Sequence, residues 1–64
     1  MNEHEIIAAI DNGKHVFWGS HTYPVVRLCG KYWITCTINA NAIPLSQDGM
    51  LNGCEEDFFV DENP

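Results

Sequence analysis

The sequence predicts a single α+β domain over residues 1–64, in which a short N-terminal helix precedes four or five antiparallel strands. Isoleucines at helical spacing open the chain, residues 32–38 alternate between two faces, and short apolar runs separated by turn residues fill the remainder. So many strands in so short a chain favour a strongly curled sheet, with a small SH3-like barrel as its closed form, because closure removes exposed edges. The alternative is one open sheet with the helix across one face.

The predicted helix covers residues 3–11. Asn2 is a suitable N-cap, and Glu5, three residues later, completes a capping box. Gly13 suits the left-handed conformation in which helices commonly end. Because a helix of this length is unstable alone, it must dock on the sheet. The stripe that would dock consists of three isoleucines, Ile6, Ile7 and Ile10.

Residues 32–38 give the clearest strand signal in the chain. Tyr32 and Ile34 fall on one side and Trp33 and Thr35 on the other, and the alternation continues to Ile38. The other expected strands are shorter and are bounded by turn residues. They cover residues 15–18, 22–28, 42–45 and 58–60, and residues 61–64 are expected to form a frayed acidic tail.

The register of the hairpin formed by residues 22–28 and 32–38 determines which side chains share a face. A two-residue loop at 30–31 would mix polar and apolar residues on each face. A three-residue loop at 29–31 pairs Val26 with Ile34 and gives a clean apolar face, so this register is the expectation. It leaves three residues together on the opposite face: Tyr23, Arg27 and Trp33.

Charge and size narrow the class of partner. Nine acidic residues against three lysines and arginines give a formal net charge of −6. This charge disfavours binding to nucleic acid and to anionic membranes, and it permits a basic protein partner. A chain of 64 residues has a thin core with little material for a deep pocket, and oligomerisation would bury more of its surface.

The sequence contains no recognisable catalytic or metal motif, and we expect no enzyme and no cofactor. Three cysteines without a CxxC pair do not form a disulfide framework. The spacing of His15 and His21 only just fits a zinc site, and Cys29 and Cys36 are too far apart in sequence, so surface histidines and buried thiols are the expectation. No secretory segment or long apolar run is apparent, which predicts a cytoplasmic protein with reduced thiols.

Residues 48–59 carry Asp-Gly, Asn-Gly and Asp-Phe-Phe elements, and residues 16–18 and 32–34 are rich in aromatic side chains. On these elements the chain resembles, over about residues 6 to 60, short uncharacterised proteins of phages and plasmids. The resemblance implies an accessory protein of a mobile element, and it carries no catalytic assignment.

Two groups of residues are candidates for contact with a partner. The first is Tyr23, Arg27 and Trp33, because aromatic residues and arginine dominate binding hot spots, and Trp18 is an additional candidate. Burial of these residues under the helix would instead make them part of the core. The second group is the acidic run Glu55, Glu56 and Asp57, for which a solvated face that keeps the domain soluble is the more ordinary explanation.

The sequence therefore predicts a non-enzymatic, acidic protein-binding domain. One alternative is an inhibitor that mimics nucleic acid and blocks a DNA-binding protein. Another is a structural unit that forms homo-oligomers.

Overall fold

The N-terminal helix α1 (Glu3–Asp11) begins at the predicted capping box. The computed structural model describes residues 1–61. In it the Asn2 side chain accepts a hydrogen bond from the Glu5 backbone at 2.8 Å, and the Glu5 carboxylate accepts one from the Asn2 backbone at 3.0 Å. The helix ends at Asn12, after which Gly13 has a φ of +80°. The helix has the range that the sequence predicts.

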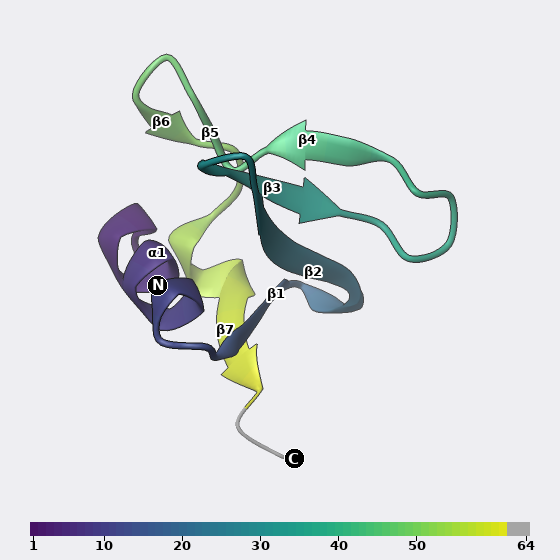
Figure 1. The fold of residues 1–64 in the computed structure, drawn as a ribbon, viewed down its shortest axis with the longest axis horizontal. Coiled ribbons are helices and arrows are strands. Elements are labelled where there is room, and N and C mark those ends of the chain that lie inside the picture. The colour runs from purple at the N-terminus through teal and green to yellow at the C-terminus, as the bar shows by residue number, and fades with distance from the viewer. Residues whose placement is uncertain (62–64) are drawn as a thin grey trace.

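A five-stranded antiparallel sheet follows, in the spatial order β4-β3-β2-β1-β7 (Figure 1). Its strands are β1 (His15–Trp18), β2 (Ser20–Leu28), β3 (Lys31–Thr35), β4 (Ala42–Pro44) and β7 (Phe58–Asp61). A small hairpin of β5 (Ser46–Gln47) and β6 (Met50–Leu51), followed by the 3-10 helix η1 (Glu55–Asp57), connects β4 to β7.

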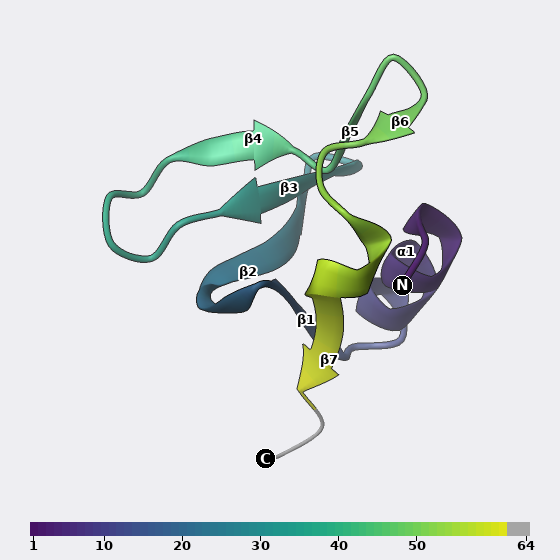
Figure 2. The ribbon, with the colours of Figure 1, turned by 180° about the vertical axis from the view of Figure 1, so that it is seen from behind.

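The α+β class is confirmed, but the sheet is open and is not strongly curled. Strands β4 and β7 form its two edges, and three strands separate them. Figure 2 shows the β3–β4 hairpin extending away from β7, so these two edges do not meet. The expected SH3-like closure therefore does not form. The arrangement matches the alternative of one open sheet with a helix on one face.

Strand β3 ends at Thr35, three residues earlier than expected. The Cys36 backbone N–H donates to Asn41 and the Ala40 N–H donates to Cys36, which closes a turn after Thr35. Ile38 consequently lies in a loop, with 82% of its surface exposed. At the other end of the chain, β7 includes Asp61, which we expected in the acidic tail, and residues 62–64 of that tail lie outside the described residues.

The register of the β2–β3 hairpin differs from both registers that the sequence suggested. Val25 lies opposite Ile34 and Val26 opposite Trp33, so the loop consists of Cys29 and Gly30. Both loop residues have positive φ, +53° and +77°, which is the geometry of a type I′ turn. Its twist matches that of the flanking strands, whereas the expected register required a three-residue loop. The prediction is off by one residue, and this exchanges the two faces of one strand relative to the other.

The hydrophobic core lies between α1 and one face of the sheet, which we call the inner face. Val16, Val25 and Ile34 occupy adjacent strands on this face and meet Ile6 and Ala9 of the helix. Two residues from the segments after β4 complete the buried cluster, namely Leu45 and Phe58. Within residues 1–61, no helix has the length and apolar character needed to cross a membrane.

Candidate interaction surface

The opposite face of the sheet carries a continuous set of apolar side chains. Because side chains alternate along a strand, the neighbours of the buried valines point away from the core. Val26 lies opposite Trp33, which in turn lies opposite Pro44, while Phe17 lies between Pro24 and Phe59. We call this the outer face and define it by six residues: Phe17, Pro24, Val26, Trp33, Pro44 and Phe59.

The outer-face residues are separate from the core. None of the six belongs to the buried cluster or to the apolar side chains packed against it. All six are nevertheless only partly exposed, because they shield one another across neighbouring strands. The outer face is therefore an apolar surface that the described core does not use.

An aromatic cluster lies at the β1–β7 side of the outer face. The rings of Phe17 and Phe59 stack with centroids 5.7 Å apart. The exposed His21 ring lies 4.6 Å from Phe17 and 5.5 Å from Phe59, and its Nε2 lies 2.8 Å from Asp61 Oδ2. Since a carboxylate only accepts hydrogen bonds, the His21 ring nitrogen is the donor. This bond holds a third ring beside the two phenylalanines.

Most of the acidic residues lie away from the outer face. Three of them are on α1, one is in the turn between β5 and β6, and three form η1. Asp61 lies on the outer side of the sheet, because it is opposite His15 and alternates with the inward-facing Val60. Glu3 borders the outer face, because it lines one cavity with Trp33 and Pro44. Lys31, opposite Leu28, places a positive charge on the same side of the sheet. The outer face is thus nearly neutral on a protein of net charge −6.

The observed register separates the residues that the sequence grouped as a hot spot. Trp33 is on the outer face, whereas Tyr23 and Arg27 lie two residues to either side of the buried Val25 and therefore share its inner face. The prediction that these three share a face is therefore wrong. Its cause is the one-residue register difference, which exchanges the faces of β3 relative to β2.

Trp18 and Tyr23 pack together on the inner side. Their rings make an edge contact with centroids 5.4 Å apart, and both border a shallow cavity of about 180 Å³ beside Ile43. Both side chains are partly buried against the core. Packing in the fold therefore explains why these two positions are aromatic, and no binding partner is needed to explain it. The Trp18 Nε1 atom is buried against Gly53 and has no hydrogen-bond acceptor within residues 1–61.

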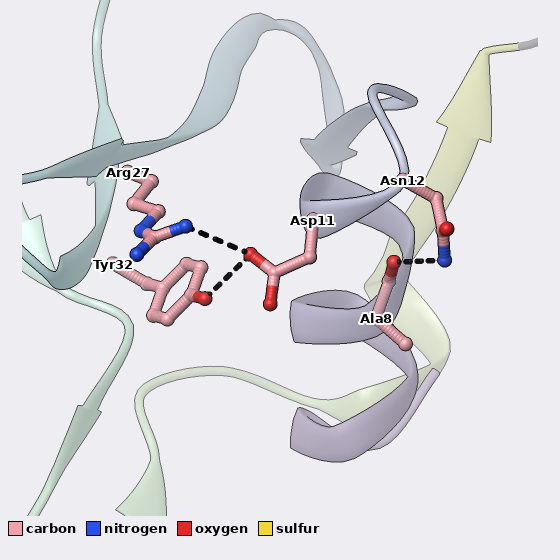
Figure 3. Close-up of polar contacts among 5 residues, drawn as sticks. All are labelled: Ala8, Asp11, Asn12, Arg27 and Tyr32. Carbon is pink, nitrogen blue, oxygen red and sulfur yellow. Dashed lines mark hydrogen bonds and ion pairs between the residues drawn. The ribbon is translucent and has the colours of Figure 1, made fainter.

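Arg27 takes part in a polar cluster that joins the helix to the sheet (Figure 3). Asp11 accepts a hydrogen bond from the Tyr32 hydroxyl at 2.8 Å and lies 3.5 Å from Arg27 Nη1. The hydrogen bond to Asp11 is the largest cause of a raised Tyr32 pKa, and desolvation and the charge of Asp11 act in the same direction. These contacts attach the end of α1 to the β2–β3 hairpin. They give Arg27 a structural role.

The acidic run Glu55, Glu56 and Asp57 forms the exposed 3-10 helix η1. The N-terminal ammonium group donates a hydrogen bond to the Glu55 carbonyl oxygen, which places the start of the helix beside η1. Within residues 1–61, no group of three or more potential ligands is placed to hold a metal ion, and the three cysteines are free thiols.

A second concave region lies between the first turn of α1 and the β3–β4 side of the sheet. Its volume is about 440 Å³, and Glu3 and Ile7 of α1 line it together with Trp33 and Pro44 of the outer face. The lining that the structure describes contains no histidine or cysteine. A shallow groove of this composition does not point to a particular reaction.

Two residues that are central to the outer face, Phe17 and Phe59, did not stand out in the sequence. The alternation of residues 15–18 separates Phe17 from Val16, but it does not show which side is covered. The pairing of β7 with β1 brings Phe59 to Phe17 across more than 40 residues of chain, and no local pattern indicates it.

Protein-family models, curated proteins and solved structures give no match to this chain.

Proposed function

We propose that this protein is a small acidic binding domain without enzymatic activity and that it contacts a protein partner through the outer face. The observation that carries the proposal is the apolar, aromatic face that the core leaves unused. Apolar side chains are scarce in a 64-residue chain, and placing six of them outside the core limits the stability of the fold. Contiguous apolar surface of this kind is typical of interaction sites.

The composition of the outer face also supports binding. Trp33, Phe17 and Phe59 supply large rigid rings, and such residues are enriched where interfaces derive most of their binding energy. The neutral character of the face avoids the desolvation cost of burying charges. The resemblance to phage and plasmid proteins adds the proposal that the partner is a cytoplasmic protein of the host or of the element itself.

An acidic mimic of nucleic acid is the second candidate. The hydrogen bond between the N-terminus and Glu55 favours it, because this contact places the start of α1, whose first turn is acidic, beside the acidic η1. Such a protein would bind a basic groove, and its binding would weaken steeply as salt increases.

A capture experiment with variants distinguishes these two surfaces. The wild type, Trp33→Ala and a variant with Glu55→Gln, Glu56→Gln and Asp57→Asn are compared as baits in bacterial lysate at low and high salt. Ile38→Ala is the matched control, because it removes an exposed apolar side chain that lies in the loop between β3 and β4 and is not one of the six outer-face residues. We expect a partner that Trp33→Ala loses and that the other two variants retain at both salt concentrations.

The opposite results would contradict the proposal. A partner captured equally by the wild type and Trp33→Ala would show that the outer face is not the contact. A partner that is lost from the acidic triple variant and at high salt, and displaced by DNA, would support mimicry instead.

A further inference from the structure

We propose that the partner adds an extended segment of its own chain, as a further antiparallel strand, to the edge of β7 that faces away from β1. We call this edge the β7 edge. The inference rests on the proposed function, because it states how a partner of the outer face engages the sheet. The added segment carries an apolar side chain beside Phe59 and lysine or arginine toward η1.

The ladder between β1 and β7 shows which backbone groups the β7 edge presents. The Gly19 N–H donates to the Asp57 carbonyl oxygen at 2.7 Å. This pair lies two residues along the ladder from Phe17 and Phe59, in the same register. Hydrogen-bonded pairs alternate with non-bonded pairs in an antiparallel ladder, so Phe59 bonds to β1 and Val60 does not. The Val60 N–H and C=O therefore point toward the β7 edge.

No strand among residues 1–61 pairs with the β7 edge. β7 is the last strand in the sheet order, and Figure 2 shows it in front of β1 with no other described segment over it. The Phe58 N–H donates to the Glu55 carbonyl oxygen within the chain. The Phe58 C=O and both backbone groups of Val60 are thus presented to a partner. Such a row of unpaired groups is a template to which an extended peptide adds as a strand.

The side chains next to the β7 edge specify an apolar residue in the added strand. In antiparallel pairing, the residue opposite Phe59 belongs to a non-hydrogen-bonded pair, in which the side chains approach closely. It lies on the outer face, beside the stacked rings of Phe59 and Phe17, whose centroids are 5.7 Å apart. An aliphatic or aromatic side chain at this position extends the outer face by one strand.

Charge disfavours a second copy at the β7 edge and favours a basic segment. The three carboxylates of η1 directly precede β7, and the strand ends at Asp61. Pairing of two β7 edges would bring these acidic groups together, on chains that each carry a net charge of −6. Lysine or arginine in the added segment instead meets the carboxylates of η1. Because exposed ion pairs contribute little affinity, backbone and apolar contacts supply most of the binding.

Amide hydrogen exchange of the free protein, followed by NMR, tests the geometry of the β7 edge. We expect the Val60 amide to exchange at least about tenfold faster than the Phe59 amide, because only the Phe59 N–H is bonded to β1. Equal exchange rates of the two amides would overturn the inference.

A short capped peptide of alternating valine and lysine is the probe for strand addition. We expect about 1 mM of this peptide to slow exchange of the Val60 amide at least about twofold and to shift the amide signals of β7. The matched peptide of valine and glutamate should have no such effect. An unchanged Val60 exchange rate with the lysine peptide, or an equal effect of the glutamate peptide, would overturn the inference.

Two variants at one position distinguish backbone pairing from side-chain contact. Val60→Pro removes the N–H that points to the β7 edge without removing a bond to β1, and edge strands tolerate proline at such positions. Val60→Ala shortens the same side chain and keeps the N–H. We expect the lysine peptide to shift the Phe59 amide signal in Val60→Ala and not in Val60→Pro. Equal shifts in both variants, with circular dichroism verifying the fold, would overturn the inference.

Lysate capture with the same variants separates the failure of this inference from the failure of the proposed function. A partner that depends on Trp33 and is captured equally by Val60→Pro and Val60→Ala would overturn strand addition and leave the outer face as the contact. A partner that Trp33→Ala retains would overturn the proposed function. Slower Val60 exchange at higher protein concentration, without peptide, would show a second copy at the β7 edge and overturn the choice of a basic segment.

Discussion

Asp11 connects three segments of the chain through a single carboxylate. It ends α1, accepts a hydrogen bond from Tyr32 at the start of β3, and lies beside Arg27 near the end of β2. These two contacts orient the C-terminal end of α1 relative to the β2–β3 hairpin. Its most direct consequence concerns the ionisation of Tyr32.

The pKa of Tyr32 is raised above its ordinary value, chiefly because the neutral hydroxyl donates to the Asp11 carboxylate. Since the folded-state pKa lies above that of the unfolded chain, this contribution to stability is fully present below about pH 10 and is lost as the pH rises through the folded-state pKa. We expect Asp11→Asn to lower the Tyr32 pKa toward its usual value of about 10, as followed by ring NMR signals during a pH titration.

Glu3→Gln, which removes a carboxylate at the other end of the same helix, is the control for this titration and should leave the Tyr32 pKa unchanged. A Tyr32 pKa that Asp11→Asn does not lower would show that the hydrogen bond is not its cause.

At the scale of elements, the β2–β3 turn decides how the sheet is assembled. Cys29 has a φ of +53°, a conformation that costs most L-residues free energy and that asparagine tolerates well. Because Gly30 follows, asparagine at position 29 would give the Asn-Gly pair that type I′ turns prefer. Cysteine is therefore a strained choice at a position that fixes the register.

We expect Cys29→Asn to increase the free energy of unfolding by about 0.5 to 1 kcal/mol, measured by urea denaturation at low protein concentration. Cys29→Ala is the matched control, because it removes the same exposed thiol without supplying a residue that tolerates positive φ. It should give no comparable gain. Loss of stability in Cys29→Asn would contradict the two-residue turn and the faces that follow from it.

At the scale of the whole molecule, the sheet has one face that holds the fold together and one that does not contribute to the core. Ile6, which is 0% exposed, lies between the helix and the inner face, whereas Ile43 is 46% exposed on the edge strand β4. The same substitution at these two positions should therefore have very different effects.

We expect Ile6→Ala to lower the free energy of unfolding by about 2 to 5 kcal/mol, and Ile43→Ala by about 1 kcal/mol or less. A domain of this size has little stability to lose, so Ile6→Ala should be substantially unfolded at 25 °C. Thermal and urea denaturation of both variants tests this. Similar losses at the two positions would contradict the one-sided core.

The sequence alone determined the local structure of this protein. The Asn2–Glu5 capping box and the isoleucine spacing specify the helix through contacts within a few residues, and the alternation around Trp33 specifies a strand in the same way. The α+β class follows from these elements. Phe17 and Trp33 could also be recognised from the alternation as side chains that differ in orientation from their neighbours.

Tertiary structure decided which face each of these side chains occupies. Registers that differ by one residue have nearly the same local chemistry, and only the turn at Cys29 together with the packing of Val25 and Ile34 under the helix selects one. The pairing of β7 with β1 is a contact between distant segments, and it alone brings Phe59 to Phe17. The outer face therefore depends on long-range packing, because no local pattern records which side of a sheet the helix will cover.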